Sequence, residues 1–307
     1  MFDYNGFQWL FFFYFYCFGG WCFESAYVSF KSKKWVNRGF MRGPFLPLYG
    51  SGAIMMLVVS MPFQDNLWLT YIAGVIGATA LEYVTGVAME ALFQVRYWDY
   101  TGKFMNYQGR ICLRSSLAWG FLTILMTRVI HRPIESLMYA MPEQVLHYFT
   151  ILLTIYIVAD FTLSFKAALD LRDIMVKIES AKEELGRMQK RLDVLIAFSN
   201  DEKEQKQLDR EERRELLMND LTAALEQKFA ILKEKLLSKP LAYGENVREE
   251  IAELRGKFSL YREEQREEGK LLDFFKRDMI RNNPSMRSET YGSAFEELRN
   301  IVNGQEK

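Results

Sequence analysis

Five apolar stretches occupy the first half of the chain, and their length constrains the fold more than any other feature. Each is about long enough to cross a hydrocarbon core of roughly 30 Å as a helix. A helix also satisfies its own backbone hydrogen bonds, which a segment in lipid must do. We therefore predict an all-α, polytopic membrane bundle with the lipid bilayer as its first partner. The stretches are residues 7–28, 48–63, 67–93, 111–130 and 145–165.

The second stretch is the shortest, because Pro62 and the polar turn at 64–66 end it early. A tilted or partly re-entrant segment fits these residues as well as a full span does. No basic region precedes the first stretch, so we interpret it as a retained helix and not as a cleaved signal peptide.

Composition changes near residue 168, which predicts a transmembrane domain over residues 1–168 and a cytoplasmic helical domain over 169–307. The first part carries 12 basic and 9 acidic side chains, and the second carries 27 and 30. Neither part is basic enough to indicate nucleic-acid binding. The cations of the first part gather at residues 31–42 and 96–114. Because loops rich in Lys and Arg stay in the cytoplasm, we expect a cell-membrane protein with its N-terminus outside and its C-terminus inside.

The tail begins with a heptad pattern, in which apolar residues recur three and four apart from Leu171 to Leu195. This spacing is typical of a coiled coil. No Gly or Pro lies between Pro142 and Gly186, so the last membrane helix is expected to continue into it. The later breaks favour antiparallel packing back onto this helix, whereas a parallel homo-oligomer or a protein partner at the seam fits the sequence equally. Further helices are expected over residues 216–237, 247–261 and 294–302.

Ionisable side chains inside the apolar stretches need an explanation, because each costs about 2.5–3.5 kcal/mol at the centre of a membrane helix. Glu24 lies in the first stretch, and Glu82 and Glu90 lie eight residues apart in the third, on similar helix faces. Asp160 shares a heptad position with Ile174, so it is expected to face the bundle and not lipid.

The two basic loops are predicted to form the walls of a polar site that opens to the cytoplasm. In the first loop Gly and Pro make a rigid turn, and arginines of both loops can offset carboxylate charge. The alternative is that these carboxylates and cations only satisfy one another at the membrane surface. Predicted substrate- or ion-binding residues are Glu24, Asn37, Arg38, Arg42, Glu82, Glu90, Trp98, Asp99, Tyr100, Asn106, Arg110 and Arg114. Predicted structural loop residues are Gly39, Gly43, Pro44, Pro47, Tyr49 and Gly50.

Four motifs occur in order: "GWCFES", "VNRGFMRGPFLPLYG", "LEYVTGVAMEALF" and "YWDYTGKFMNYQGRICLRSSLAWG". Together they resemble the ABC-transporter permease family of the CmpB type, which also includes small vertebrate multi-pass transmembrane proteins. The resemblance covers residues 7–165, leaves the tail outside and implies transport. It carries the family's pattern onto most of the residues above, and onto Gly20, Trp21 and Gly109.

Three functions fit these observations. The first is a permease-like subunit or ion-coupled carrier whose three glutamates bind a cation or proton. Any ATPase would be a separate subunit, because the chain has no G-x-x-x-x-G-K-[S/T] motif. The second is a membrane enzyme or binding protein for a lipid headgroup or lipid-linked substrate, and the third is a membrane-anchored coiled-coil scaffold or sensor.

Catalytic chemistry has little support in the sequence. No nucleophile elbow, histidine-containing constellation or metal-ligand cluster is present, so we favour a non-enzyme and expect neither cofactor nor metal. The three cysteines, Cys17, Cys22 and Cys112, form no paired framework and are expected to be packing residues.

Overall fold

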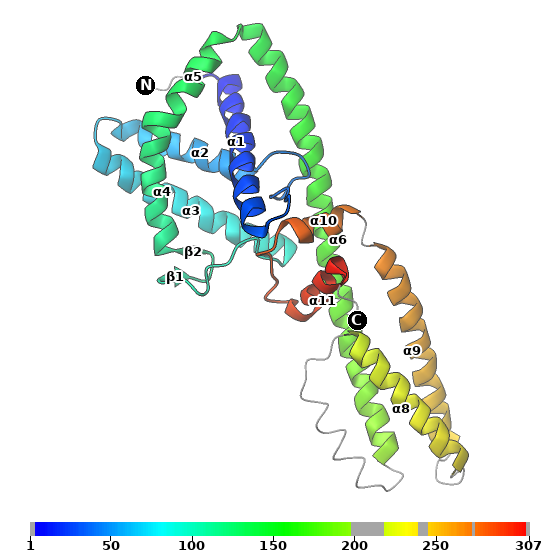
Figure 1. Cartoon of the computed structure of the whole chain (residues 1–307). Helices are drawn as coiled ribbons and strands as arrows, with labels where there is room; N and C mark the ends of the chain where they lie inside the picture. Colours follow the sequence, from blue (N-terminus) through cyan, green and yellow to red (C-terminus); the bar gives the residue numbers. More distant parts are fainter. Residues whose placement is uncertain (1–3, 198–217, 239–244, 272–273, 305–307) are drawn as a thin grey trace. The chain divides into compact units, whose positions relative to one another are not determined.

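The protein is described by a computed structural model, which covers residues 4–197, 218–238, 245–271 and 274–304 (Figure 1). Within these ranges the regular structure is helical, apart from a hairpin of two short strands, β1 (Asn106–Tyr107) and β2 (Ile111–Cys112). The predicted all-α class is therefore confirmed. The described residues form two compact units. Unit 1 contains the chain up to Leu171 together with Phe275–Glu289, and unit 2 contains the rest.

Unit 1 is built from apolar helices joined by short connections. Three of its helical runs are long and apolar enough to cross a membrane: Leu67–Phe93, Leu113–Ala140 and the beginning of Glu143–Ile196. They carry large exposed apolar side chains, such as Ile76, Val84 and Leu152, that suit lipid better than water. The elements are α1 (Gly6–Ser32), α2 (Pro47–Ser60), η1 (Met61–Phe63), α3 (Leu67–Phe93), α4 (Leu113–Leu125), η2 (Met126–Ile130), α5 (His131–Ala140), α6 (Glu143–Ala197) and α10 (Phe274–Asn282).

The second predicted stretch forms α2 and the short 3-10 turn η1, which together make a shorter apolar helix over Pro47–Phe63. Helix α1 has 27 residues and an aromatic-rich sequence. Asn5 caps α1 through a hydrogen bond from the Gln8 backbone N–H, and Asn66 caps α3 in the same manner. The number of membrane crossings beyond the three long runs stays a prediction.

Two clusters of buried side chains hold the helices of unit 1 together. Phe12 of α1, Leu57 of α2 and Met138 of α5 lie in the first cluster. Tyr14 and Cys17 of α1 pack in the second, together with residues of the first loop and of α6. Helix α1 therefore contacts both the α2–α5 side and the α6 side of the unit.

The helical run that begins in the predicted stretch 111–130 continues beyond the end of that stretch. Residues 126–130 form the π-helical turn η2, and α5 continues from His131 to Ala140. His131 is fully buried, and its Nδ1 atom lies 2.7 Å from the Tyr16 hydroxyl. A π-helical turn directly before Pro133 is a local adjustment that lets a helix continue past a proline.

Unit 2 is a helical assembly around the second part of α6, which continues without a break to Ala197 as predicted. The heptad residues from Leu171 to Leu195 are buried within the single chain. Helix α9 runs antiparallel to α6, because the Glu250 carboxylate pairs with Arg191 at 3.0 Å whereas the Tyr261 hydroxyl donates to Glu184 at 2.6 Å. The other elements are α8 (Met218–Ser238), α9 (Glu245–Leu271) and α11 (Gly292–Asn303).

Candidate functional site

The first loop is a fixed turn of unit 1. Gly39 has a φ of +137°, a conformation that glycine adopts readily and other residues do not. The Asn37 side chain accepts a hydrogen bond from the Trp21 indole N–H at 2.6 Å and donates to the Arg42 carbonyl at 2.7 Å. Pro47 begins α2, where its missing N–H removes no helical hydrogen bond. These contacts connect the two ends of the loop to α1 and α2.

The same loop is tied to α6. The Gly43 N–H donates to Asp160 Oδ2 at 2.8 Å, and Asp160 is only 8% exposed, so it faces the protein as predicted. The Arg42 guanidinium lies 3.5 Å from the Phe275 ring centroid. Of the remaining predicted loop residues, Pro44 precedes α2, and Pro47, Tyr49 and Gly50 lie in its first turn.

Glu24 lies in a polar cluster with the first loop. Its Oε2 atom accepts a hydrogen bond from the Tyr49 hydroxyl at 2.7 Å, and its Oε1 atom lies 3.7 Å from Arg38 Nε. Arg38 also donates to the Asn283 side chain at 2.7 Å. Burial lowers the pKa of Arg38 below its ordinary value, and the nearby Glu24 charge opposes this effect. The Glu24 carboxylate is thus matched by a cation and a hydroxyl.

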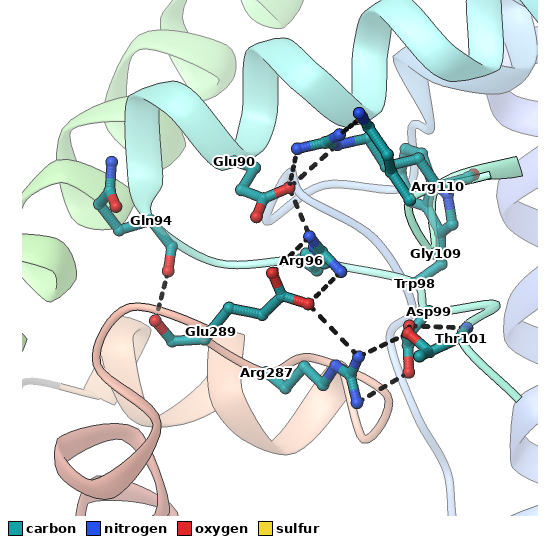
Figure 2. Close-up of polar contacts among 12 residues, drawn as sticks. Glu90, Gln94, Arg96, Trp98, Asp99, Thr101, Gly109, Arg110, Arg287 and Glu289 are labelled. Carbon is teal, nitrogen blue, oxygen red and sulfur yellow. Dashed lines mark hydrogen bonds and ion pairs between the residues drawn. The ribbon is translucent and has the colours of Figure 1, made fainter.

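Glu90 is paired with two arginines (Figure 2). Arg96 Nε lies 2.9 Å from Glu90 Oε2, and Arg110 Nη2 lies 2.8 Å from the same oxygen. Burial alone would lower the pKa of Arg96, but the Glu90 carboxylate raises it above the ordinary arginine value. Arg96 also donates to Glu289 Oε2 at 2.6 Å. This end of α3 therefore carries a network of alternating charges.

The third loop is ordered by its own polar side chains. The Trp98 indole N–H donates to the Arg110 carbonyl at 2.9 Å. The Asn106 side chain donates to the Thr101 carbonyl at 3.0 Å and accepts from the Gly109 N–H at 3.2 Å. These bonds, in which Trp98 and Asn106 take part, hold the loop together around the β1–β2 hairpin.

Glu82 has surroundings of another kind. Its carboxylate accepts hydrogen bonds from the Tyr100 hydroxyl at 3.0 Å, the Trp119 indole at 3.0 Å and the Ser115 hydroxyl at 3.4 Å. The residue is 5% exposed, and in the described part of the chain no Lys, Arg or His side chain forms an ion pair with it. Burial and the Glu82 charge raise the pKa of Tyr100. Glu82 is a buried carboxylate surrounded by neutral donors.

Arg114 is not brought to the other predicted site residues. It is exposed, and across the described ranges its side chain pairs with neither Glu24 nor Glu90. Arg96, which is not among the predicted site residues, pairs with Glu90 because its place in the third loop lets it reach the end of α3. Trp119 and Ser115 were also missed, although their i, i+4 spacing puts two polar side chains on one helix face.

A segment from the tail completes the network around the third loop. We call residues 283–289 the strap, and all of them belong to unit 1. Arg287 forms an antiparallel backbone bridge with Arg96, with N···O distances of 2.7 and 3.0 Å. The sequence analysis did not predict that this segment docks on the third loop. The polar run between two amphipathic helices was the available signal for a docking segment.

A comparison with known families assigns the first part of the chain. The family model described as "Putative ABC-transporter type IV" matches residues 11–165. The chain belongs to this family. Searches of curated proteins and of solved structures gave no significant match. The family and the apolar helices together identify an ABC-transporter-like membrane protein. The three glutamates and both loops lie within the matched residues, whereas the strap lies outside them.

Proposed function

We propose that the chain is a permease-like transport subunit with five membrane crossings, its N-terminus outside and its C-terminus in the cytoplasm. The 27 residues of α1 and the apolar α2–η1 segment support two crossings in addition to the three long runs. The cations of both loops support the orientation. Residues 1–168 then form the membrane domain and residues 169–307 a cytoplasmic domain, from which the strap returns to the loops.

The contacts divide the three intramembrane glutamates into two kinds, and this division supports a role for Glu82. Glu24 and Glu90 are matched by arginines, so binding a cation there requires an existing ion pair to break. Glu82 is held by three neutral donors. A carboxylate at membrane depth without a countercharge is typical of ion and proton pathways. We therefore propose that Glu82 binds the transported or coupling cation or proton.

The third loop would contribute to this site by positioning a hydrogen-bond donor. Tyr100 reaches Glu82 from the third loop, and that loop is fixed by the pairing of Glu90 with Arg96 and Arg110. A change in the arginine network would therefore move a hydrogen-bond donor of Glu82. Through this connection, the charged residues at the cytoplasmic side would control access of the ion to Glu82, and Glu82 would bind it.

A flux assay tests the proposal. The full chain is reconstituted in liposomes with an imposed proton or potassium gradient, and internal dyes for pH and potassium report flux. We expect the wild type to conduct one of these ions, and Glu82→Gln to reduce that flux at least about tenfold. Asp65→Asn is the matched control, because Asp65 is an exposed carboxylate in the turn before α3. Equal flux in wild type and Glu82→Gln would rule out this role for Glu82.

We also propose that unit 2 mediates assembly as a coiled-coil domain, with a second copy, a protein partner or a separate ATPase subunit. The heptad seam is covered within one chain, so a partner would bind the charged outer faces of the helices. Mass photometry of the full chain at several concentrations measures self-association directly. A scaffold without transport would leave Glu82→Gln indistinguishable from the wild type in every assay.

A further inference from the structure

The strap docks on the third loop through an isolated antiparallel backbone bridge. The Arg96 and Arg287 backbones exchange two hydrogen bonds, and the Ser288 hydroxyl donates to the Gln94 carbonyl at 2.6 Å. On the other side, the Ser285 hydroxyl donates to the Tyr97 carbonyl at 2.8 Å. Backbone pairing of this type supplies affinity, and the alternate side chains of the docked segment supply specificity.

Two strap side chains of opposite charge contact the same part of the third loop. Arg287 and Glu289 are two residues apart and project toward one another, with Arg287 Nη2 3.7 Å from Glu289 Oε1. Glu289 contacts both terminal nitrogens of Arg96, the two-pronged arrangement that arginine uses for carboxylate and phosphate. Arg287 Nη1 lies 2.9 Å from Asp99 Oδ2, and its Nη2 donates to Thr101 at 2.8 Å (Figure 2).

Gly109 makes room for these groups. Its φ is +67°, and a Cβ atom at this position would lie 2.7 Å from Thr101 Oγ1, 3.0 Å from Asp99 Oδ1 and 3.1 Å from Arg96 Nη1. The three side chains therefore converge around one glycine. We call Arg96, Asp99, Thr101 and Gly109 the cradle. It places a guanidinium fork beside a carboxylate and a hydroxyl.

The charges of the cradle define what it can bind. Glu90 occupies Arg96 Nε, so the terminal nitrogens of Arg96 remain for a second anion, which Glu289 supplies in this structure. Asp99 offers one negative charge, which Arg287 matches. Without the strap, the cradle would present one site for an anion and one for a cation a few ångströms away. Its complement is a zwitterion whose cationic group carries N–H donors.

We propose that the cradle binds a zwitterionic group of the phosphoethanolamine type, with the anion on Arg96 and the ammonium on Asp99 and Thr101. In this structure Arg287 and Glu289 occupy the place of that ligand. The inference rests on the proposed function in taking the loops to lie at the cytoplasmic membrane surface. Trp98 and Tyr100 on the same loop suit the depth of lipid headgroups. A choline headgroup has no N–H to donate to Asp99, so the cradle should discriminate against it.

Native mass spectrometry of the full chain measures the lipids that it retains from nanodiscs. The nanodiscs contain phosphatidylcholine alone, or with phosphatidylethanolamine or phosphatidylglycerol. We expect retention of phosphatidylethanolamine above the other two. The double variant Arg287→Ala with Glu289→Ala vacates the cradle and should raise this retention roughly tenfold, which corresponds to about 1.4 kcal/mol. Asp99→Asn should abolish the preference over phosphatidylcholine, whereas the matched control Asp65→Asn should preserve it.

Amide hydrogen exchange of the strap provides a second readout and separates the two sources of the ligand. Faster exchange with phosphatidylethanolamine nanodiscs than with phosphatidylcholine nanodiscs supports a lipid headgroup. Faster exchange when soluble phosphoethanolamine is added to phosphatidylcholine nanodiscs supports a free zwitterion.

Two results would overturn the inference. The first is equal retention of the three lipids, together with no effect of phosphoethanolamine, by the folded double variant. The second is equal retention of phosphatidylglycerol and phosphatidylethanolamine, because it shows that only the anion is recognised. Neither result depends on ion flux, so a failure here and a failure of the Glu82 proposal are distinguishable.

Discussion

Glu82 and Glu90 lie on one helix, eight residues apart, yet the protein surrounds them differently. Glu90 lies three residues before the end of α3, within reach of Arg96 and Arg110 from the following loop. Glu82 lies two turns deeper, where it contacts Tyr100 and donors of α4. An arginine pair fixes a negative charge in place, whereas neutral donors are compatible with the cation or proton binding that we propose for Glu82. The comparison separates a carboxylate that stabilises the loop from one that can serve transport.

The largest effect that tests this comparison is expected from Arg96→Ala. The change leaves Glu289 with only the longer 3.7 Å contact to Arg287 and leaves Glu90 with Arg110 alone, at a position where the Arg96 side chain is only 8% exposed. Removing one partner of a buried pair leaves an uncompensated charge, so we expect a loss of about 3 kcal/mol in unfolding free energy. Thermal or denaturant unfolding in nanodiscs provides the measurement.

Arg114→Ala is the matched control for this experiment. Arg114 is exposed at the start of α4, and its side chain has no ion-pair partner within the described residues. We expect a change within about 0.5 kcal/mol. If both alanine variants lost the same stability, the arginine network would not hold the loop, and the contrast between the two glutamates would lose its basis.

The next effect in size separates the two glutamates directly. Glu90→Gln removes the anion from Arg96 and Arg110 together, and we expect a loss of about 2 kcal/mol. Glu82→Gln keeps hydrogen-bonding capacity, because the Tyr100 and Ser115 hydroxyls can rotate to accept from the new amide. Its expected cost is below about 1 kcal/mol. The unfolding free energies of the two variants are measured in the same nanodiscs. A larger loss for Glu82→Gln than for Glu90→Gln would contradict the assignment of Glu90 to structure and Glu82 to binding.

The helical architecture was predictable from the sequence because it depends on patterns that are local in the chain. Apolar length predicted the helices of unit 1, and three-four spacing predicted the buried face of α6 from Leu171 to Leu195. The same register predicted that Asp160 faces inward. The end of the stretch 111–130 was predicted too early, because apolar content falls at Arg132 although a π-helical turn lets the helix continue to Ala140.

The sequence predicted many of the residues of the candidate site, but not how they pair. Residue types and motif order indicated Glu24, Glu82, Glu90 and the loop arginines, but pairing depends on side-chain reach in three dimensions. Arg96 and Arg114 are both cations near membrane ends, and nothing in the sequence distinguishes the one that reaches Glu90. The strap was missed because its contacts with the third loop join positions nearly two hundred residues apart, and polar segments carry no periodic signal.

A smaller effect concerns the pair between Asp99 and Arg287, whose side chains are 20% and 39% exposed. A double-mutant cycle of Asp99→Asn and Arg287→Ala isolates their interaction, and we expect a coupling of about 0.5–1 kcal/mol. Unfolding of the four proteins under identical conditions gives this value. A coupling near zero would mean that the strap is held by its backbone bonds alone and that its charges contribute no selectivity.

The smallest effect is expected for an exposed ion pair, which serves as a comparison for the buried networks around Glu82 and Glu90. Arg191 and Glu250 in unit 2 are joined by a 3.0 Å hydrogen bond, and this bond holds the pKa of Glu250 below its ordinary value. A depressed carboxylate pKa stabilises the folded state above the unfolded pKa, about 4.3, and this stability is lost as the pH falls through the folded value. Mild acid should therefore narrow the difference in thermal midpoint between the wild type and Arg191→Ala.

Solvent screening makes this difference small even at neutral pH. Arg187→Ala supplies the control, because its 3.9 Å contact with Glu183 is exposed on both sides and carries no hydrogen bond in the described structure. If Arg191→Ala cost as much as Arg96→Ala, the effect of Arg96 could not be attributed to burial. Burial is the property that distinguishes the networks of unit 1 from the surface of unit 2. It is also the reason that a carboxylate without a cationic partner among the described residues, as at Glu82, supports the proposed binding role there, whereas the same observation on the exposed tail would support none.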